Sequence, residues 1–281
     1  MRIDEGAIAE YAAGLPVPAG KDLPPFAADD PKTVAAFAIC MNAINFGSGW
    51  WPTIRKRPGH SGYATMAAGV TERFERAGPW STEELATMDA ETIAPVVGQD
   101  PEHPLMLQFA DALRDVGDHI ENDHGGCFLA PAEEARSIPD LAGTFSTWDT
   151  FADTSTYDGR PVPFFKRAQL AAADLHRARV ADIPGPDRLT AFADNLVPHV
   201  LRVDGVLQLA PSLTARIEAS DLLEHGSPQE VELRAAAVQV VELLAATSPL
   251  TPAEIDSALW NRGRNPRYKA IPRPRSRNTA Y

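Results

Sequence analysis

Helix-start signals recur along this chain and limit the folds open to it. In a capping box, a Ser or Thr side chain accepts a hydrogen bond from the backbone three residues later, and a Glu side chain there returns one. Three segments match this pattern ahead of apolar-periodic stretches: residues 81–84 (Ser-Thr-Glu-Glu), 227–230 (Ser-Pro-Gln-Glu) and 251–254 (Thr-Pro-Ala-Glu). The chain is therefore expected to be mainly α-helical.

Apolar spacing and proline placement locate further helices. Asp30 followed by Pro31 predicts a helix start and a helix that continues to Ile44. Helices are also expected over residues 166–177 and from 189 to about 201, where Pro198 kinks or shortens the second one. The clearest helix begins near residue 228, because five apolar residues share one face at helical spacing: Leu233, Ala237, Val240, Val241 and Leu244.

Few strands are expected. Residues 160–164, Arg-Pro-Val-Pro-Phe, favour an extended backbone because proline disfavours the helical conformation in the residue before it. The chain has no internal repeat, and its 281 residues can bury a sizeable core. We therefore predict a single all-α domain over residues 1–281, with room for a few short strands.

The composition is that of a globular protein with an acidic body. Hydrophobic residues make up 44% and charged residues 23% of the chain. The formal net charge is −12, although residues 262–281 hold seven basic side chains and no acidic one. An acidic body argues against broad binding to a nucleic-acid backbone. From charge alone, the basic end is either a solvated tail or a place for a single phosphate.

The cysteines and the apolar runs indicate a compartment. Only Cys40 and Cys127 are present, far apart in sequence, which does not favour a disulfide framework and indicates a reducing cytosol. The first residues lack the apolar stretch of a secretion signal, and no run approaches the ~20 apolar residues that span a bilayer. We expect a cytoplasmic protein without membrane association.

One group of metal-ligand residue types lies within ten residues of sequence. Zinc is suited by ligands of these kinds. However, neither paired-His nor paired-Cys spacing is present, and Gly125-Gly126 indicates a turn, so an exposed polar loop explains the group as well. We expect no metal. The group comprises Asp118, His119, Asp123, His124 and Cys127.

Local signatures of nucleotide-binding loops and serine hydrolases are absent from the sequence. Gly47-Ser48-Gly49 lacks the glycine and lysine that follow in a phosphate loop, and it follows a predicted helix rather than a strand. Neither a dinucleotide fingerprint nor a Gly-x-Ser-x-Gly elbow occurs. No organic cofactor is expected.

Charged residues inside apolar segments are the strongest candidates for a site. Asp194 lies among Phe192 and Leu196, and Asp256 lies between Ile255 and an apolar stretch. Burying a charge is costly unless the charge is paired or used, so each aspartate is either functional or a structural cap or ion pair.

Two cations raise the same question. Lys166 and Arg167 directly follow two phenylalanines. The pair favours either an anion site or a helix end whose long side chains reach out to solvent.

Short segments spread over residues 43–281 resemble the queuosine salvage proteins, the queuosine 5′-phosphate N-glycosylases, when they are taken in order. They are Ala43-Ile44-Asn45-Phe46, Phe151-Ala152-Asp153, Tyr157-Asp158-Gly159, Phe165-Lys166-Arg167-Ala168-Gln169, Phe192-Ala193-Asp194 with Val197-Pro198, Glu230-Val231-Glu232-Leu233-Arg234-Ala235-Ala236, Ile255-Asp256 with Leu259-Trp260, and the Arg-rich run into Tyr281.

The resemblance implies a fold and an activity. The fold would be all-helical and similar to that of helical DNA glycosylases. The enzyme would hydrolyse the N-glycosidic bond of queuosine 5′-phosphate and release queuine for reinsertion into tRNA. It would need no metal or cofactor, act on a small-molecule nucleotide, form no stable complex with nucleic acid, and be a monomer.

The resemblance also implies roles for residues. Asp194 would be the catalytic carboxylate that stabilises an oxocarbenium-like state and contacts the nucleoside. Asp256 would grip the base and assist its departure, because queuine is a 7-deazapurine without an N7 to protonate. Lys166 would hold the 5′-phosphate, with Arg275 or Arg277 from a 262–281 segment folded back on the site. The other implied substrate-binding residues are Asn45, Phe46, Phe192 and Trp260.

Three segments depart from the family pattern and leave alternatives open. The family continues Phe-Ala-Asp with Tyr-Arg-Val-Pro-Gln, whereas residues 195–199 are Asn-Leu-Val-Pro-His; residues 47–51 and 272–277 also differ. One alternative is an N-glycosylase for another modified, 7-deazapurine nucleotide. The other is a non-catalytic module that binds RNA or nucleotide through its basic end.

Overall fold

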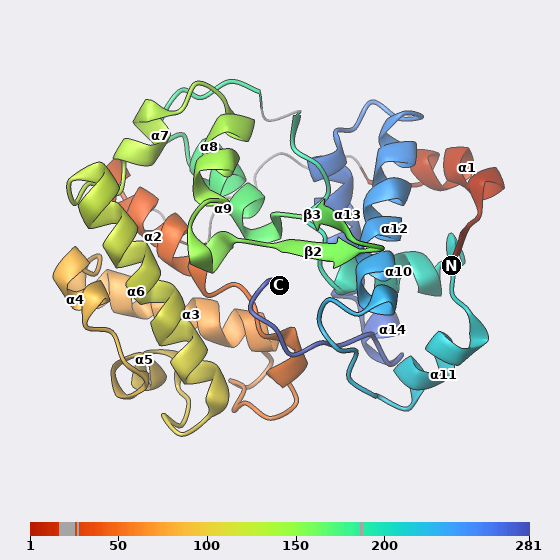
Figure 1. Cartoon of the computed structure of the whole chain (residues 1–281), viewed down its shortest axis with the longest axis horizontal. Helices are drawn as coiled ribbons and strands as arrows, with labels where there is room; N and C mark the ends of the chain where they lie inside the picture. Colours follow the sequence, from red (N-terminus) through yellow and green to blue (C-terminus); the bar gives the residue numbers. More distant parts are fainter. Residues whose placement is uncertain (17–25, 27, 186–187) are drawn as a thin grey trace.

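The computed structural model describes residues 1–16, 26, 28–185 and 188–281. Within these ranges the chain forms fourteen α-helices and two small antiparallel sheets (Figure 1). The prediction of a mainly helical fold with a few short strands is confirmed. The α-helices are α1 (Ile8–Ala13), α2 (Pro31–Ala43), α3 (Gly62–Ala77), α4 (Thr82–Ala86), α5 (Ala90–Val97), α6 (Pro104–His124), α7 (Ala130–Glu134), α8 (Ile138–Phe145), α9 (Lys166–Arg177), α10 (Leu196–Val203), α11 (Pro211–Glu218), α12 (Pro228–Ala245), α13 (Pro252–Gly263) and α14 (Pro266–Lys269). The strands are β1 (Arg2–Ile3), β2 (Thr154–Tyr157), β3 (Arg160–Pro163) and β4 (Leu207–Gln208), and three 3-10 turns span Glu5–Ala7, Ser48–Trp50 and Asp149–Phe151.

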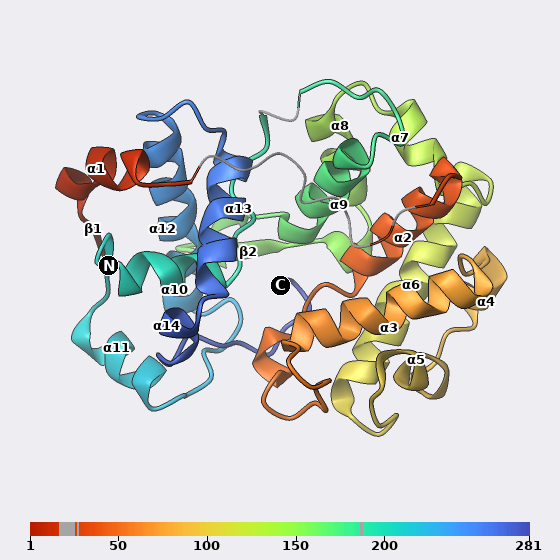
Figure 2. The same cartoon turned by 180° about the vertical axis from the view of Figure 1, so that it is seen from behind.

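The helices form two groups, each around its own apolar core. In the first group, α2, α3, α5, α6, α8 and α9 bury residues such as Phe37 and Phe109. In the second, α1 and α10 to α13 bury residues such as Leu201 and Val240. Views from the front and from behind show the two groups side by side, with Tyr281 at the end of the chain between them (Figures 1 and 2). The positions of side chains between the groups therefore depend on the packing of both cores.

Most of the predicted helix starts are confirmed. Asp30 accepts hydrogen bonds from the backbone N–H groups of residues 32 and 33, and α2 follows it. The reciprocal capping boxes form at α4, from Ser81, and at α13, from Thr251. Helix α9 has the bounds that the sequence predicts, and the apolar face predicted for α12 is buried. Local hydrogen-bonding rules are sufficient at these positions.

The predicted capping box at residues 227–230 does not form, although α12 begins at Pro228 as expected. The Ser227 hydroxyl has no hydrogen-bond partner among the described residues. Glu230 instead accepts a hydrogen bond from the N–H of Gly226, and its other carboxylate oxygen lies 3.9 Å from the Arg234 guanidinium. The carboxylate that the capping box requires is instead occupied by the N–H of Gly226 and by Arg234, one turn further along α12.

The helix predicted from residue 189 begins later, at Leu196. The prediction was wrong because long-range partners hold the preceding backbone extended: Thr190 donates its N–H to Gln169, and Phe192 donates its N–H to Asp256. Pro198 does not kink the helix, since it lies in the first turn, where its missing N–H costs nothing.

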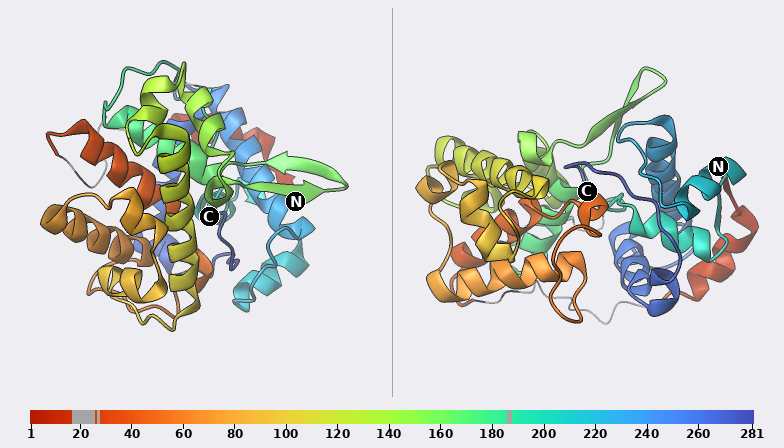
Figure 3. Two further views of the ribbon diagram at one scale, coloured as in Figure 1. Left: turned by 60° about the vertical axis from the view of Figure 1, so that its left-hand side comes forward. Right: turned by 90° about the horizontal axis from the view of Figure 1, so that it is seen from below.

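The segment predicted to be extended forms β3, which pairs with β2 in a hairpin. The hairpin projects from the body in the side views (Figure 3) and contacts α12, where the Tyr157 hydroxyl donates to Glu232.

The C-terminal segment crosses between the two groups of helices. Leu223 donates its N–H to the carbonyl of Arg275 at 2.8 Å, and Gly47 donates its N–H to Tyr281 at 3.2 Å. Glycine is required at position 49, because a Cβ there would lie 2.3 Å from the carbonyl oxygen of Ser276. The two cysteines are free, and none of the described helices has the length and apolar character needed to cross a membrane.

Candidate active site

Asp194 lies between the two groups of helices and is fixed at one of its two carboxylate oxygens. Its Oδ1 accepts hydrogen bonds from the N–H groups of Leu196 and Val197, at 2.7 and 3.0 Å. These donors belong to the first turn of α10, where no intrahelical acceptor exists for them. The second oxygen, Oδ2, has no hydrogen bond to any residue that the structure describes. Asp194 is thus a cap, as one interpretation of the sequence proposed, and retains an unoccupied oxygen as well.

Asp256 comes from α13 and is 4% exposed. Its Oδ1 accepts the hydrogen bond from the N–H of Phe192 at 3.0 Å, which ties α13 to the segment that carries Asp194. Burial, and then the nearby charge of Asp194, raise the pKa of the Asp256 carboxyl well above its usual value. The side chain therefore keeps its proton to a higher pH than an ordinary aspartate.

Lys166 is the first residue of α9 and is 6% exposed. Its ammonium donates one hydrogen bond, at 3.0 Å, to the carbonyl of Asn45, so two of its three donors have no partner among the residues that the structure describes. Burial lowers the pKa of Lys166 to about 8, against the opposing influence of Asp194 and Asp256.

The charge of Asp194 acts on the pKa of both Lys166 and Asp256, yet Lys166 forms no ion pair with either carboxylate in the described structure. We call these three residues the unpaired cluster. Charged groups that are buried without partners are costly, and such groups concentrate where a ligand supplies the missing partner. The arrangement can hold an anion at the ammonium while presenting carboxyl groups to the rest of the ligand.

Arg167, the neighbour of Lys166, has a different role from the one that an anion site would give it. Its guanidinium donates to the carbonyls of Ala43 and Thr150, and it lies over the ring of Phe46 at 4.8 Å. Burial lowers its pKa to about 9. Its donors are committed to backbone acceptors, so of the two adjacent cations only Lys166 has donors to spare.

A second group of charges contacts the backbone of Lys166 and of Ala193, the residue before Asp194. The carboxylate of Asp153 is held by the Arg234 guanidinium through two hydrogen bonds of 2.9 and 2.6 Å, and Glu230 lies 3.9 Å from the same guanidinium. All three side chains are 1–2% exposed. We call them the paired cluster. Asp153 and Arg234 satisfy each other, and Glu230 adds a second, longer ion pair to the same guanidinium.

The tail approaches the site through a residue that the sequence reasoning did not single out. Arg273 is largely buried and interacts electrostatically with Asp194, and burial lowers its pKa. The backbone of Arg275 pairs with Leu222, and Arg277 is exposed, with its guanidinium 6.0 Å from the ring centre of Trp50. The alternation of proline and arginine does not reveal which arginine faces inward.

The other predicted binding residues are spread around the cluster. Asn45 contributes its carbonyl to Lys166. The ring of Phe46 lies in the core, edge-on to Phe109 at 5.1 Å, and Phe192 is buried with its N–H on Asp256. Trp260 packs edge-on against Tyr63 at 6.0 Å, where α13 meets α3. The structure thus brings together Lys166, Asp194, Asp256, the Asn45 carbonyl and the Phe192 backbone, while the rings of Phe46 and Trp260 make protein contacts.

Two residues at which the chain departs from the family pattern are buried. Asn195 donates to the Ser48 hydroxyl and to the carbonyl of Pro274, at 2.9 and 2.8 Å. His199 is hydrogen-bonded through Nε2 to the carbonyl of Tyr268 at 2.9 Å. Both residues attach the tail to the body, so these departures concern how the tail is held.

The histidine-rich group predicted as an exposed loop lies mostly on α6. His119 contacts Asp123 at 2.6 Å and stacks on Trp148, with ring centres 4.8 Å apart, and His124 contacts Glu134 at 3.1 Å. The prediction of a loop was wrong because the helix continues to His124 before Gly125 ends it. No group of three potential metal ligands is found among the described residues.

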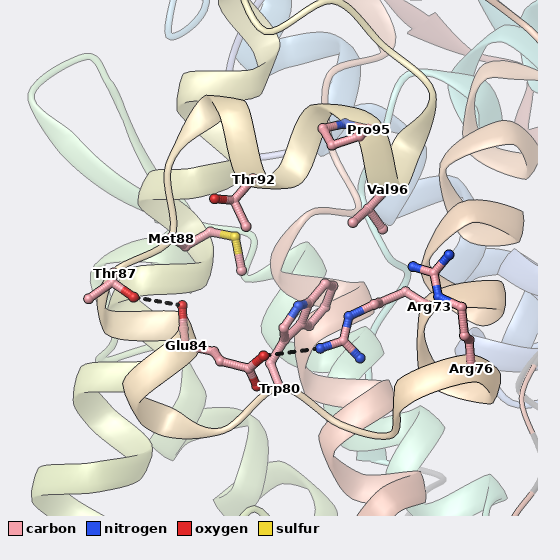
Figure 4. A pocket seen from close by; sticks show the side chains of 9 residues that line it. All are labelled: Arg73, Arg76, Trp80, Glu84, Thr87, Met88, Thr92, Pro95 and Val96. Atoms are coloured by element: carbon pink, nitrogen blue, oxygen red, sulfur yellow. Dashed lines mark hydrogen bonds and ion pairs between the residues drawn. The ribbon is translucent and has the colours of Figure 1, made fainter.

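A surface pocket of about 440 Å³ lies between α3, α4 and α5, away from these residues (Figure 4). Its most prominent cation, Arg73, is paired with Glu84 at 3.2 Å and lies over Trp80 at 5.4 Å. None of the predicted site residues lines this pocket. The unpaired cluster therefore remains the better candidate for chemistry.

Fold and site together define a class: a helical protein in which a buried ammonium and a buried carboxyl group lie beside a partly buried carboxylate, between two groups of helices. Comparison with known proteins narrows this class. The family model described as queuosine salvage protein matches residues 25–281. The chain belongs to the queuosine salvage protein family.

Named relatives come from bacteria and eukaryotes. A protein of Sphaerobacter thermophilus is 31% identical over 90% of this chain and 83% of its own length. A relative from Dictyostelium discoideum is 28% identical over 89% of this chain and 79% of its own, and one from Mus musculus is 26% identical over 79% and 72%. Each is named queuosine 5′-phosphate N-glycosylase/hydrolase.

Proposed function

We propose that this protein is an N-glycosylase that hydrolyses queuosine 5′-phosphate to queuine and ribose 5-phosphate. The observation that carries the proposal is the Asp194 carboxylate, which is fixed through Oδ1 by two backbone donors and has Oδ2 unoccupied. Both the family and the names of the relatives support it.

Asp194 would stabilise the cationic sugar. When the C1′–N bond breaks, its electron pair leaves with the base and positive charge develops on the ribose. A carboxylate already oriented by Leu196 and Val197 can face that charge without reorganising, which is the general condition for electrostatic catalysis. Water then supplies the hydroxyl group to C1′ and releases a proton to solvent.

Asp256 would assist the departing base. A 7-deazapurine has carbon at position 7, so protonation must occur at another atom of the base. With Oδ1 accepting the N–H of Phe192, the Oδ2 oxygen of a protonated Asp256 can donate to the base edge. The raised pKa of Asp256 supports this role, because a general acid needs a pKa near the working pH.

Lys166 would bind the 5′-phosphate, and Arg273 is the tail arginine best placed to help. The two unused donors of Lys166 support the assignment. The side chain of Arg273 forms no ion pair or hydrogen bond with other described residues. The charge of Asp194 nevertheless acts on its pKa. We include the folded-back 262–281 segment in the proposal as part of the site.

The contacts of the tail bear on the alternative functions. Arg262 and Arg267 both lie within ion-pair distance of Asp204, at 3.1 and 3.6 Å, and the Arg275 carbonyl is bonded to Leu223. A tail held in this way gives little support to a flexible RNA-binding arm. We further propose a monomeric, cytoplasmic enzyme, and the two free cysteines support a reducing compartment.

The test is product release. Purified protein is incubated with queuosine 5′-phosphate, and free base and ribose 5-phosphate are quantified against time. Queuosine without phosphate, guanosine 5′-phosphate and a second 7-deazapurine nucleotide serve as comparisons. Release of queuine at the highest kcat/KM supports the proposal. Preferential release of another base would favour the other N-glycosylase, and no release from any of them would overturn the enzymatic assignment.

A further inference from the structure

The paired cluster touches the backbone of both halves of the site. Asp153 Oδ2 accepts a hydrogen bond from the N–H of Lys166 at 3.2 Å. Arg234 Nε donates to the carbonyl of Ala193, the residue before Asp194, at 2.9 Å. One ion pair therefore holds the backbone at Lys166 and the backbone next to Asp194. These two residues come from different parts of the chain.

The backbone at the start of α9 is held in a conformation that it would not adopt alone. Phe165 has a φ of +49°, in the left-handed region that non-glycine residues avoid. The carbonyl of Asp153 accepts hydrogen bonds from the N–H groups of Phe164 and Phe165, at 2.9 and 3.3 Å. Asp153 thus stabilises the strained turn with its backbone and the next N–H with its side chain. Strain of this kind is often retained where a side chain must be aimed.

Aromatic rings hold the other partner in place. The Arg234 guanidinium lies 4.0 Å from the ring centre of Phe164 and 4.5 Å from that of Tyr281. The ring of Phe164 belongs to the strained turn, and that of Tyr281 belongs to the tail. Arg234, from α12, therefore joins both to the segment of Asp194.

Stability alone does not account for such a pair. Replacing a buried ion pair with apolar residues of similar volume is often neutral or stabilising. The geometry points to another role. We propose that Asp153 and Arg234 are positioning residues for the glycosidic hydrolysis, which fix Lys166 and Asp194 at the separation that the nucleotide requires. The inference rests on the proposed function.

The decisive variant removes both members of the Asp153–Arg234 pair, so that neither is left as a buried charge without the other. A double variant, Asp153→Leu with Arg234→Met, is measured for kcat, KM and melting temperature with queuosine 5′-phosphate. We expect a folded protein whose kcat/KM falls about 100-fold, most of it in kcat, because displacement by about 1 Å is costly to a preorganised site. A folded double variant with kcat within threefold of the wild type would overturn the inference.

A second variant keeps the proposal testable if the double variant does not fold. Asp153→Asn keeps the shape and one acceptor but weakens the grip on Arg234, and it should lower kcat about tenfold. If the double variant does not fold, an unchanged kcat in Asp153→Asn overturns the proposal in its place.

The matched control is Glu84→Gln. Glu84 is another carboxylate with several partners, since it accepts from the N–H of Ser81 at 2.8 Å and from Arg73 at 3.2 Å, but it does not contact Lys166, Asp194 or the tail. This variant should melt at a lower temperature with unchanged kcat and KM. An equal loss of kcat would mean that general loosening, not positioning, explains the result. Inactive wild-type protein would instead refute the proposed function, so the two failures are distinguishable.

Discussion

The unpaired and paired clusters lie next to each other, and the charges in them are bonded in opposite ways. In the paired cluster, Asp153 and Arg234 satisfy each other through two hydrogen bonds, and both also bind backbone. In the unpaired cluster, two donors of Lys166 and one oxygen of Asp194 have no hydrogen-bond partner within the described ranges. Burial alone therefore does not identify a functional charge. What distinguishes the site is the bonding capacity that the protein leaves unused.

The charge of Asp194 gives the largest test of this contrast. Asparagine is as good a helix cap as aspartate, so Asp194→Asn should keep the hydrogen bonds to Leu196 and Val197 while removing the negative charge. We expect kcat to fall about 100- to 1,000-fold with little change in melting temperature. Steady-state kinetics and thermal unfolding check this. Turnover near the wild-type rate would remove Asp194 from the mechanism.

Asp194→Ala separates the two roles of the residue. It should lose the same activity and, in addition, about 1 kcal/mol of stability from the missing cap. Chemical denaturation of the Ala and Asn variants measures the difference. Equal stabilities of the two variants would show that the cap contributes little to the free energy of unfolding. Only the loss of activity would then distinguish Asp194 from a structural residue.

Replacing Lys166 tests whether its spare donors bind phosphate. Lys166→Met keeps the length of the side chain and removes the charge. Loss of a charge-assisted contact should raise KM for queuosine 5′-phosphate about 10- to 100-fold and leave KM for unphosphorylated queuosine unchanged. An equal effect on both substrates would contradict phosphate binding.

The ionisation of Lys166 predicts a pH dependence. Since burial lowers its pKa to about 8, the free enzyme loses the ammonium as pH rises through that value. The kcat/KM for the phosphorylated substrate should fall above about pH 8, approaching tenfold per unit. The fall should be absent in Lys166→Met, and a flat profile in the wild type would argue against a role for the charged form.

His199 provides the smallest test, on the structural side of the comparison. Burial lowers its pKa to about 4, below the ordinary value of 6.5, so the unfolded chain binds the proton more readily. The folded state is fully favoured above pH 6.5 and loses stability as pH falls toward 4. His199→Gln should reduce the loss of unfolding free energy between pH 7 and 5 by about 1–2 kcal/mol, as measured by urea denaturation. An unchanged loss would show that His199 does not carry it.

Features that depend on residues close together in the chain can be predicted from the sequence. The bounds of α9, the caps at Asp30, Ser81 and Thr251, and the buried face of α12 follow from local patterns. The start of α10 does not, because the extended segment before it is held by Gln169 and Asp256, which are 21 and 64 residues away from their partners.

The site shows the same limit. The sequence singles out Lys166, Asp194 and Asp256 as charges in apolar surroundings, and the structure places them together. It does not separate Lys166 from Arg167, since the two cations differ in distant contacts, such as those of Arg167 with the carbonyls of Ala43 and Thr150. Nor does it select Arg273 from the tail, because the path of the tail is set by contacts with distant parts of the chain.

The most direct measurement is a crystal structure of the Asp194→Asn variant with queuosine 5′-phosphate bound. Loss of activity should leave the substrate intact in the site. We predict the phosphate within hydrogen-bond distance of Lys166, the base edge on Asp256, and residue 194 facing C1′. A nucleotide bound elsewhere, for example in the pocket beside Arg73, or one that leaves Lys166 and Asp256 without contacts, would contradict the claim that the unpaired cluster is the site of hydrolysis.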